Sequence, residues 1–231
     1  MPETDFFYNS PMKLVVIEDQ TIIREAICQA CQRDFGHEVV GEADCSAEGL
    51  RLVLTLCPDV VILDLGLPDF SGLIVAERVR ELRPATRILV VSGYVDDATV
   101  YRMEKIGVQG FVDKNVTDTA TLRRALIALS EGRTWFSPSY ETIRHARALD
   151  PRAFTKVLSD MELRVLAEIG EGLTDQEVAA RLGITYTTVQ THRTHILRKL
   201  AIGSTPKLVA YAIKHGFTVP GPAAACVMLE H

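Results

Sequence analysis

Acidic, hydroxyl and amino side chains follow short apolar runs in the first half of the chain: Glu18, Asp19, Asp64, Ser92 and Lys114. Three carboxylates at one point would repel one another unless a hard cation such as Mg²⁺ took them as oxygen ligands. A carboxylate that attacks phosphorus also needs positive charge beside the transferred oxygens, and the cation and the lysine would supply it. Any one of these residues alone could be a solvated loop side chain, but together they predict an Mg²⁺-dependent phosphoryl site.

A parallel sheet would bring these side chains together, because ligands bind outside the carboxyl ends of its strands. Five apolar runs predict strands, and helical periodicity between them predicts five helices. The predicted strands are 14–17, 38–42, 60–64, 88–92 and 110–113, and the predicted helices are 21–34, 46–55, 72–82, 97–106 and 118–130. This alternation predicts an α/β domain with a doubly wound, five-stranded parallel sheet over residues 12–130.

The remainder of the chain has a different pattern. Residues 131–154 break the alternation and form a predicted linker, in which Pro138 and Pro151 limit any helix. Only helical periodicity follows, which predicts an all-α domain over residues 155–217 with four helices, at 160–169, 175–182, 186–200 and 206–215. Two predicted capping boxes, one of Ser159 with Glu162 and one of Thr174 with Glu177, mark helix starts. Residues 218–231 resemble a flexible tail, and the last three resemble the start of a purification tag.

A short helix, the turn LGIT and a longer helix over 186–200 have the spacing of a helix-turn-helix. On a helical wheel the longer helix has one apolar face, and the opposite face carries hydrogen-bonding side chains and no carboxylate: Thr187, Gln190, Thr191, Thr194 and Arg198. Arg193, Arg198 and Lys199 add positive charge. A polar face can be merely solvated, but the absence of acid favours a surface that reads the major groove of double-stranded DNA.

The first domain resembles the receiver domains of two-component signalling, which are flavodoxin-like, in the segments EDQ, VVILDLGLPDFSG, VVSGY and GFVDK. The resemblance implies that Asp64 accepts a phosphoryl group from a sensor histidine kinase, with Mg²⁺ held by Glu18, Asp19, Asp64 and the Gly66 carbonyl. It also implies that Phe111 is a switch aromatic that moves inward when Ser92 moves toward the phosphate. Asn115 departs from the pattern, because proline often follows the lysine.

The second domain resembles the LuxR-type helix-turn-helix over LSDMELRVLAEIGEGLTDQEVAARLGITYTTVQTHRTHILRKL, and the whole chain is similar to the NarL/FixJ class of response regulators. The resemblance implies base contacts from Gln190, Thr191 and Thr194, backbone contacts near Thr188, His192 and Lys199, and a dimer contact through the last helix. Gln190 stands where lysine is frequent and Thr205 where arginine is frequent, so both positions lack a common positive charge.

Composition agrees with a cytoplasmic regulator. The net charge is −5, but the acidity lies in residues 12–130, and no apolar run is long enough to predict a membrane span. A phosphatase of the haloacid dehalogenase type is a rival hypothesis, but such enzymes carry a second aspartate where this chain has Gly66. We therefore expect no enzyme beyond the receiver's own aspartyl phosphorylation and dephosphorylation, and a homodimer when phosphorylated. A regulator that binds DNA or a protein partner independently of phosphorylation stays open as the alternative.

Overall fold

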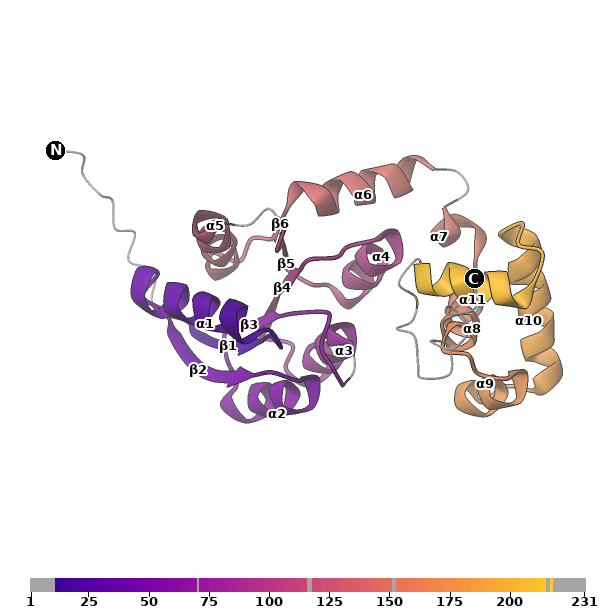
Figure 1. Ribbon diagram of the computed structural model, residues 1–231, viewed down its shortest axis with the longest axis horizontal. Coiled ribbons are helices and arrows are strands. Elements are labelled where there is room, and N and C mark those ends of the chain that lie inside the picture. Colours follow the sequence, from indigo (N-terminus) through magenta and orange to yellow (C-terminus); the bar gives the residue numbers. More distant parts are fainter. Residues whose placement is uncertain (1–10, 70, 116–117, 151–152, 215–216, 218–231) are drawn as a thin grey trace. The chain divides into compact units, whose positions relative to one another are not determined.

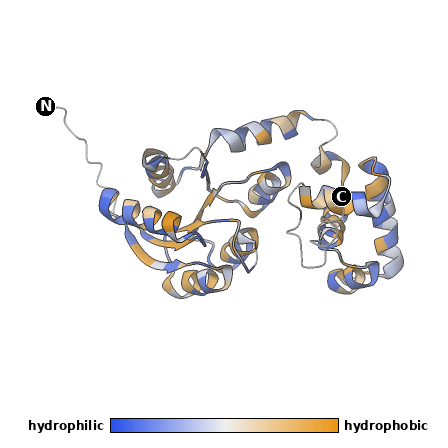
Figure 2. Ribbon diagram, in the orientation of Figure 1, coloured by the Kyte–Doolittle hydropathy of each residue, from blue (hydrophilic) through white to orange (hydrophobic). Residues whose placement is uncertain are grey.

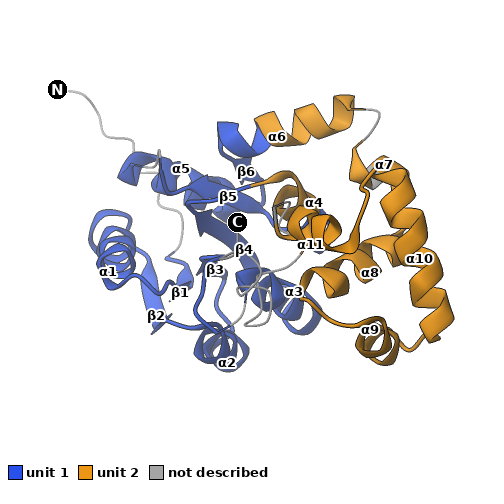
Figure 3. Ribbon diagram, turned by 45° about the vertical axis from the view of Figure 1, so that its right-hand side comes forward, with its two compact units in different colours: residues 1–95, 102–141 blue, residues 96–101, 142–231 orange. Residues whose placement is uncertain are grey.

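The computed structural model describes residues 11–69, 71–115, 118–150, 153–214 and 217. The chain divides into two compact units (Figure 3), one of residues 1–95 and 102–141 and one of residues 96–101 and 142–231. Helix α4 (Asp97–Ile106) and helix α6 (Pro138–Leu149) therefore each contribute residues to both units. No helix in the described part of the chain has the length and apolar character that crossing a membrane requires.

The first unit is built on a parallel sheet with the strand order β2-β1-β3-β4-β5-β6. The strands are β1 (Lys13–Ile17), β2 (Glu38–Ala43), β3 (Val60–Leu63), β4 (Arg87–Ser92), β5 (Gly110–Asp113) and β6 (Trp135–Phe136). The doubly wound parallel sheet predicted from the apolar runs is confirmed, but the predicted number of five strands is wrong. The sixth strand has only two residues, which is too short for a periodicity signal, and it pairs in parallel with β5.

Helices cover both faces of the sheet (Figure 1). They are α1 (Thr21–Gln29), which continues into a π-helical turn (Ala30–Asp34), α2 (Ser46–Leu56), α3 (Gly72–Leu82), α4 and α5 (Thr119–Ser130). Buried residues of α1 and α5 share one apolar cluster with Leu14 and Val16 of β1, whereas Gly49 of α2 packs against the side chain of Ile17. Successive β1 side chains point to opposite faces, so the buried run LVVI supports a helical layer on each side. Figure 2 shows the hydrophobic residues of the strands in orange.

The second unit is helical apart from its connecting segments. Beyond α6 it contains α7 (Phe154–Val157), α8 (Asp160–Gly170), α9 (Asp175–Leu182), α10 (Tyr186–Lys199) and α11 (Thr205–Lys214). The predicted capping boxes are present at the starts of α8 and α9, and Gly183 ends α9 in a left-handed conformation with φ 67°. The four predicted helices are therefore found as α8 to α11, and residue 215 lies outside the described part.

The predicted linker contains ordered elements, because β6 and α6 both lie within 131–154. Pro138 is the first residue of α6, a position where the missing backbone N–H removes no helical hydrogen bond. Within the second unit Arg147 of α6 donates to the Asp97 carboxylate over 3.2 Å, and the Tyr101 ring packs edge-on against Phe154. These contacts explain why residues 96–101 belong to the second unit. The predicted tail, residues 218–231, lies outside the described residues.

Candidate functional site

Strand register brings the acidic residues of the first unit together. In the pairing of β1 with β3, Ile17 lies opposite Leu63, so Glu18 and Asp64 are the next residues of two adjacent strands. Glu18, Asp19 and Asp64 each offer a carboxylate oxygen, and these three atoms lie within 4.8 Å of one another. Glu18 and Asp64 are buried, whereas Asp19 is more exposed, so the cluster is open to solvent on the Asp19 side.

Lys114 joins the two buried carboxylates. Its Nζ lies 2.7 Å from Oε2 of Glu18 and 2.8 Å from Oδ2 of Asp64. Burial raises the pKa of Glu18, and the nearby Asp64 charge raises it further. Burial acts to lower the pKa of Lys114, but its hydrogen bonds to Asp64 and Glu18 outweigh burial and raise it. The ammonium is therefore held in the charged state next to Asp64.

The cluster fits a divalent cation. Oδ1 of Asp19 is buried and, among the described residues, has no hydrogen-bond partner, which is costly for a carboxylate oxygen unless a cation or water satisfies it. Three carboxylates provide the oxygen donors that Mg²⁺ prefers. Gly66 lies beside the same group, since a Cβ built on it would be 3.8 Å from Oδ2 of Asp64.

The neighbouring loops place Ser92 and Asn115. Ser92 ends β4 buried, its register partner is Asp113, and its carbonyl accepts a hydrogen bond from the Lys114 N–H over 3.0 Å. Asn115 donates from Nδ2 to the Gly93 carbonyl over 2.6 Å, and its backbone N–H donates to the Asp113 carboxylate. The asparagine that replaces the frequent proline thus connects the two loops that follow β4 and β5.

Phe111 is fully buried on β5, and sequence reasoning missed its aromatic neighbours. Its ring centroid lies 5.8 Å from that of Tyr140, which stacks on Phe136 at 4.3 Å. Phe136 is also the register partner of Phe111 across β5 and β6. The dipeptide Trp135–Phe136 was the available sequence signal, but two residues gave no period to interpret.

The second unit presents the predicted DNA-binding residues on α10. A shallow hollow on this helix is lined by Thr187, Gln190, Thr191, Thr194 and His195. Thr185 caps the helix by accepting a hydrogen bond from the Thr188 N–H. Val189 and Ile196 are fully buried on the opposite face. The wheel prediction of one packed and one polar face is therefore confirmed, whereas the roles of individual residues in binding stay predictions.

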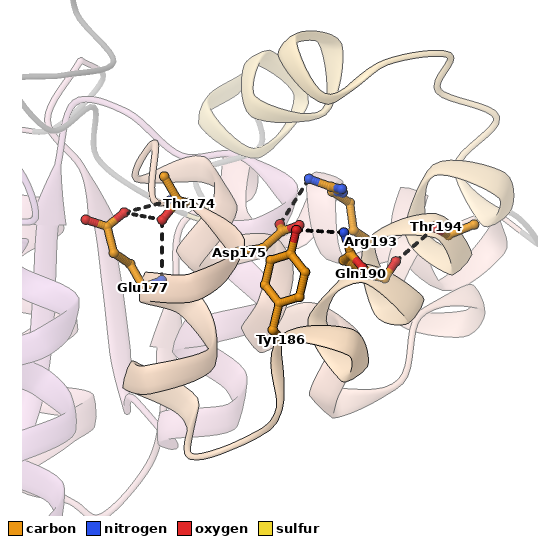
Figure 4. A network of polar contacts seen from close by, with 7 residues as sticks. All are labelled: Thr174, Asp175, Glu177, Tyr186, Gln190, Arg193 and Thr194. Carbon is orange, nitrogen blue, oxygen red and sulfur yellow. Dashed lines mark hydrogen bonds and ion pairs between the residues drawn. The ribbon is translucent and has the colours of Figure 1, made fainter.

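Two of the predicted cations, Arg193 and Lys199, are paired with carboxylates of other helices. Arg193 donates from Nη1 to Oδ1 of Asp175 over 3.0 Å (Figure 4). Lys199 Nζ lies 2.7 Å from Oε2 of Glu162. Arg198 is exposed in the last turn, and His192 is partly buried. The sequence contained no signal for the two ion pairs, because each joins α10 to another helix.

A parallel sheet with an acidic pocket at its carboxyl edge, followed by a helix-turn-helix, defines a signal receiver joined to a DNA-binding domain. Comparisons with known proteins agree. Residues 14–127 match the family described as response regulator receiver domain, and residues 156–212 match bacterial regulatory proteins, luxR family.

The chain is 32% identical over 216 residues to oxygen regulatory protein NreC of Staphylococcus epidermidis, covering 88% of this chain and 97% of that protein. A LuxR-family two-component response regulator from Aurantimonas is 29% identical, with a TM-score of 0.57 over 61% of this chain and 100% of that one. The structure of the RcsB response regulator bound to DNA has a TM-score of 0.60 over 87% of this chain and 98% of that one; at 22% identity it shows the shared fold. The chain belongs to the two-component response regulators of the NarL/FixJ class, which are DNA-binding transcription regulators.

Proposed function

We propose that a sensor histidine kinase phosphorylates Asp64 and that the phosphoryl group controls binding of α10 to operator DNA. The observation that carries the proposal is the bridge of Lys114 to both Glu18 and Asp64, at 2.7 and 2.8 Å. The Lys114 ammonium is thereby held beside Asp64, the buried carboxylate that follows β3. The proposed domains are the receiver at 12–130, the linker at 131–154 and the DNA-binding domain at 155–217.

An oxygen of Asp64 attacks the phosphorus of the phosphohistidine, a P–O bond forms, and the P–N bond breaks with its electron pair returning to the imidazole. Lys114 replaces part of its contact with Asp64 by a contact with a phosphoryl oxygen, and its ammonium group stabilises the negative charge of that oxygen. Glu18, Asp19, Asp64 and the Gly66 carbonyl would hold Mg²⁺, which when bound supplies positive charge against the remaining oxygens.

The hydroxyl of Ser92 donates to a phosphoryl oxygen in the modified state. The resulting shift of the β4–α4 loop frees space for Phe111, which acts as the switch. The phosphoryl group changes the charge locally, and this change biases a bistable element. Phosphorylated chains form a homodimer in the cytoplasm, with α11 at the contact, and present two copies of α10 to the two half-sites of an operator.

The α10 helix enters the major groove, with Gln190, Thr191 and Thr194 toward the bases and Thr187 beside them. Thr188, His192 and Arg198 lie toward the phosphates. Arg193 and Lys199 add to the electrostatic attraction from their ion-paired positions, so their effect on affinity is smaller than that of an unpaired cation.

The test measures phosphorylation and DNA binding in the same samples. The full chain is incubated with acetyl phosphate and Mg²⁺ and analysed by intact-protein mass. Its binding to a duplex selected from random sequences is measured by fluorescence anisotropy at fixed salt, with and without beryllofluoride. We expect Asp64→Asn to abolish both the added mass and the gain in affinity.

Asp59→Asn is the matched control. Asp59 precedes β3 at its amino end, where its carboxylate accepts a hydrogen bond from the Lys13 N–H over 2.7 Å. An amide oxygen can accept the same bond, so this variant should behave as the wild type. Equal affinity of the wild type with and without beryllofluoride would contradict phosphate control and favour the phosphorylation-independent regulator.

A further inference from the structure

Two cations of α10 are held against their own domain. The partners of Arg193 and Lys199 are the carboxylates of Asp175 and Glu162, whose side chains are only 9% and 4% exposed. Arginine and lysine are the side chains that most often read guanine, through its two acceptors in the major groove. Arg198 is exposed, but it lies eight residues beyond Gln190, or about 12 Å further along the helix axis. Base reading in the middle of α10 is therefore left to uncharged side chains.

Gln190 is held by a tyrosine one turn earlier. Its Nε2 donates a hydrogen bond to Oη of Tyr186 over 2.9 Å (Figure 4). Tyr186 is the first residue of α10 and is 45% exposed. In the described part of the chain the Gln190 side chain has no other hydrogen-bond partner. One amide N–H and the carbonyl oxygen therefore stay available in a fixed orientation.

That remaining pair of groups matches one base. Adenine presents an acceptor, N7, beside a donor, the N6 amino group, and an amide can satisfy both at once. Guanine presents two acceptors, N7 and O6. An amide that has already donated one N–H to Tyr186 can donate to only one of them, and its own carbonyl oxygen would face the other.

The two threonines beside Gln190 support the same preference. The Thr191 hydroxyl donates to the backbone carbonyl of Thr187 over 2.9 Å, and the Thr194 hydroxyl donates to the backbone carbonyl of Gln190 over 2.8 Å. With their protons directed at the helix backbone, these side chains offer acceptor lone pairs and methyl groups. Threonine methyl groups pack against the methyl group of thymine.

We propose that Tyr186 is a positioning residue that orients the Gln190 amide, so that α10 reads an adenine in each operator half-site. This inference rests on the proposed binding of α10 in the major groove. The Tyr186 hydroxyl accepts from Gln190 and keeps its own proton.

The experiment selects binding sites from a library of random duplexes with the full chain, in the presence and absence of beryllofluoride. Wild type, Gln190→Ala and Tyr186→Phe are compared, and the position whose base preference disappears in Gln190→Ala is the one that Gln190 reads. Anisotropy then compares duplexes with A·T, G·C or 7-deazaadenine at that position. Melting curves and circular dichroism establish that each variant is folded.

We expect the wild type to prefer A·T over G·C there by about 10-fold or more, and to lose affinity when the N7 acceptor is removed. Tyr186→Phe should reduce the A·T to G·C ratio several-fold, beyond any loss of affinity shared by all duplexes. Gln190→Lys should invert the preference toward guanine. Gln176→Lys adds the same charge on an exposed position of α9 and should leave the ratio unchanged.

A G·C preference at that position, or a ratio that Tyr186→Phe leaves intact, would overturn the role of Tyr186 and Gln190 while leaving DNA binding in place. If the wild type binds no duplex in either state, the proposed function itself is wrong, and the inference fails with it.

Discussion

Replacing Gly72 with alanine should damage the phosphorylation site from outside the acidic pocket. Gly72 begins α3, and its N–H donates to the Leu65 carbonyl over 3.1 Å. A Cβ at this position would lie 2.0 Å from the backbone oxygen of Asp64, whereas real Cβ contacts essentially never fall below 3.0 Å. Backbone must therefore move by at least about 1 Å. Asp64 is anchored to β1 through its N–H, which donates to the Ile17 carbonyl over 2.9 Å, so the strain falls on the phosphorylation loop and the start of α3.

The Gly72→Ala substitution should lower both the stability of the domain and the rate of Asp64 phosphorylation. Overpacking of this kind costs about 1–3 kcal/mol, which for a domain of this size lowers the melting temperature by about 4 °C per kcal/mol. A displacement of about 1 Å in the loop that positions the reacting groups can slow a reaction by about 100-fold. We therefore expect Gly72→Ala to melt earlier and to be labelled by acetyl phosphate on the order of 100-fold more slowly. The assays are differential scanning calorimetry and time-resolved intact mass.

Gly203→Ala is the control, because it adds the same methyl group in the second unit, at a position where a Cβ would meet nothing within 4 Å. It should change the stability by less than about 0.5 kcal/mol and leave labelling near the wild-type rate. A Gly72→Ala protein with wild-type melting and labelling would refute the close approach of α3 to Asp64.

Two further predictions concern the second unit and the β6–α6 segment. Burial acts to raise the pKa of Glu162, but hydrogen bonds from Lys199 and Ser159 lower it overall. Glu162 therefore binds a proton less tightly in the folded state than in the unfolded state. The stabilisation that ionised Glu162 gives to the folded state should be lost as the pH falls below about 4.3, the ordinary glutamate value. Urea unfolding should show a weaker acid dependence in Glu162→Gln than in the wild type, and an equal dependence would contradict the pairing. Tyr140→Ala should lower the free energy of unfolding by about 3–5 kcal/mol, because it removes a buried ring stacked on Phe136; Tyr140→Phe should lose far less in the same assay.

The acidic pocket could be predicted from the sequence because its geometry follows from the sheet. Buried runs give the strands, parallel strands share one carboxyl edge, and a residue that follows each run must lie at that edge. The capping boxes of α8 and α9 were equally readable, since Ser159 and Glu162 are three residues apart and satisfy each other's backbone groups. The capping boxes depend on local spacing alone, whereas the pocket also follows from the rule that parallel strands share one carboxyl edge.

The features that escaped prediction depend on partners distant in the sequence. Strand β6 is defined by hydrogen bonds from Trp135 and Ser137 to the carbonyls of Gln109 and Phe111, and its two residues carry no period of their own. From the sequence, Arg193 and Lys199 were only added positive charge on α10, with no sign that other helices offer them carboxylates. For a long cationic side chain, the neighbouring element determines whether its charged group is available to a ligand or pairs with a carboxylate of its own domain.

The aromatic contacts of Phe111 limit how the proposed switch can operate. Its ring is fully buried, faces Tyr140 and shares a strand pairing with Phe136, so any movement of Phe111 changes the surroundings of a residue in the first turn of α6. Packed interiors respond to such changes by discrete repacking, because they contain little free volume. Helix α6 continues from Tyr140 into residues that belong to the second compact unit. A rearrangement at Phe111 would thus reach the first turn of α6, in a segment for which the sequence alone had predicted only a linker.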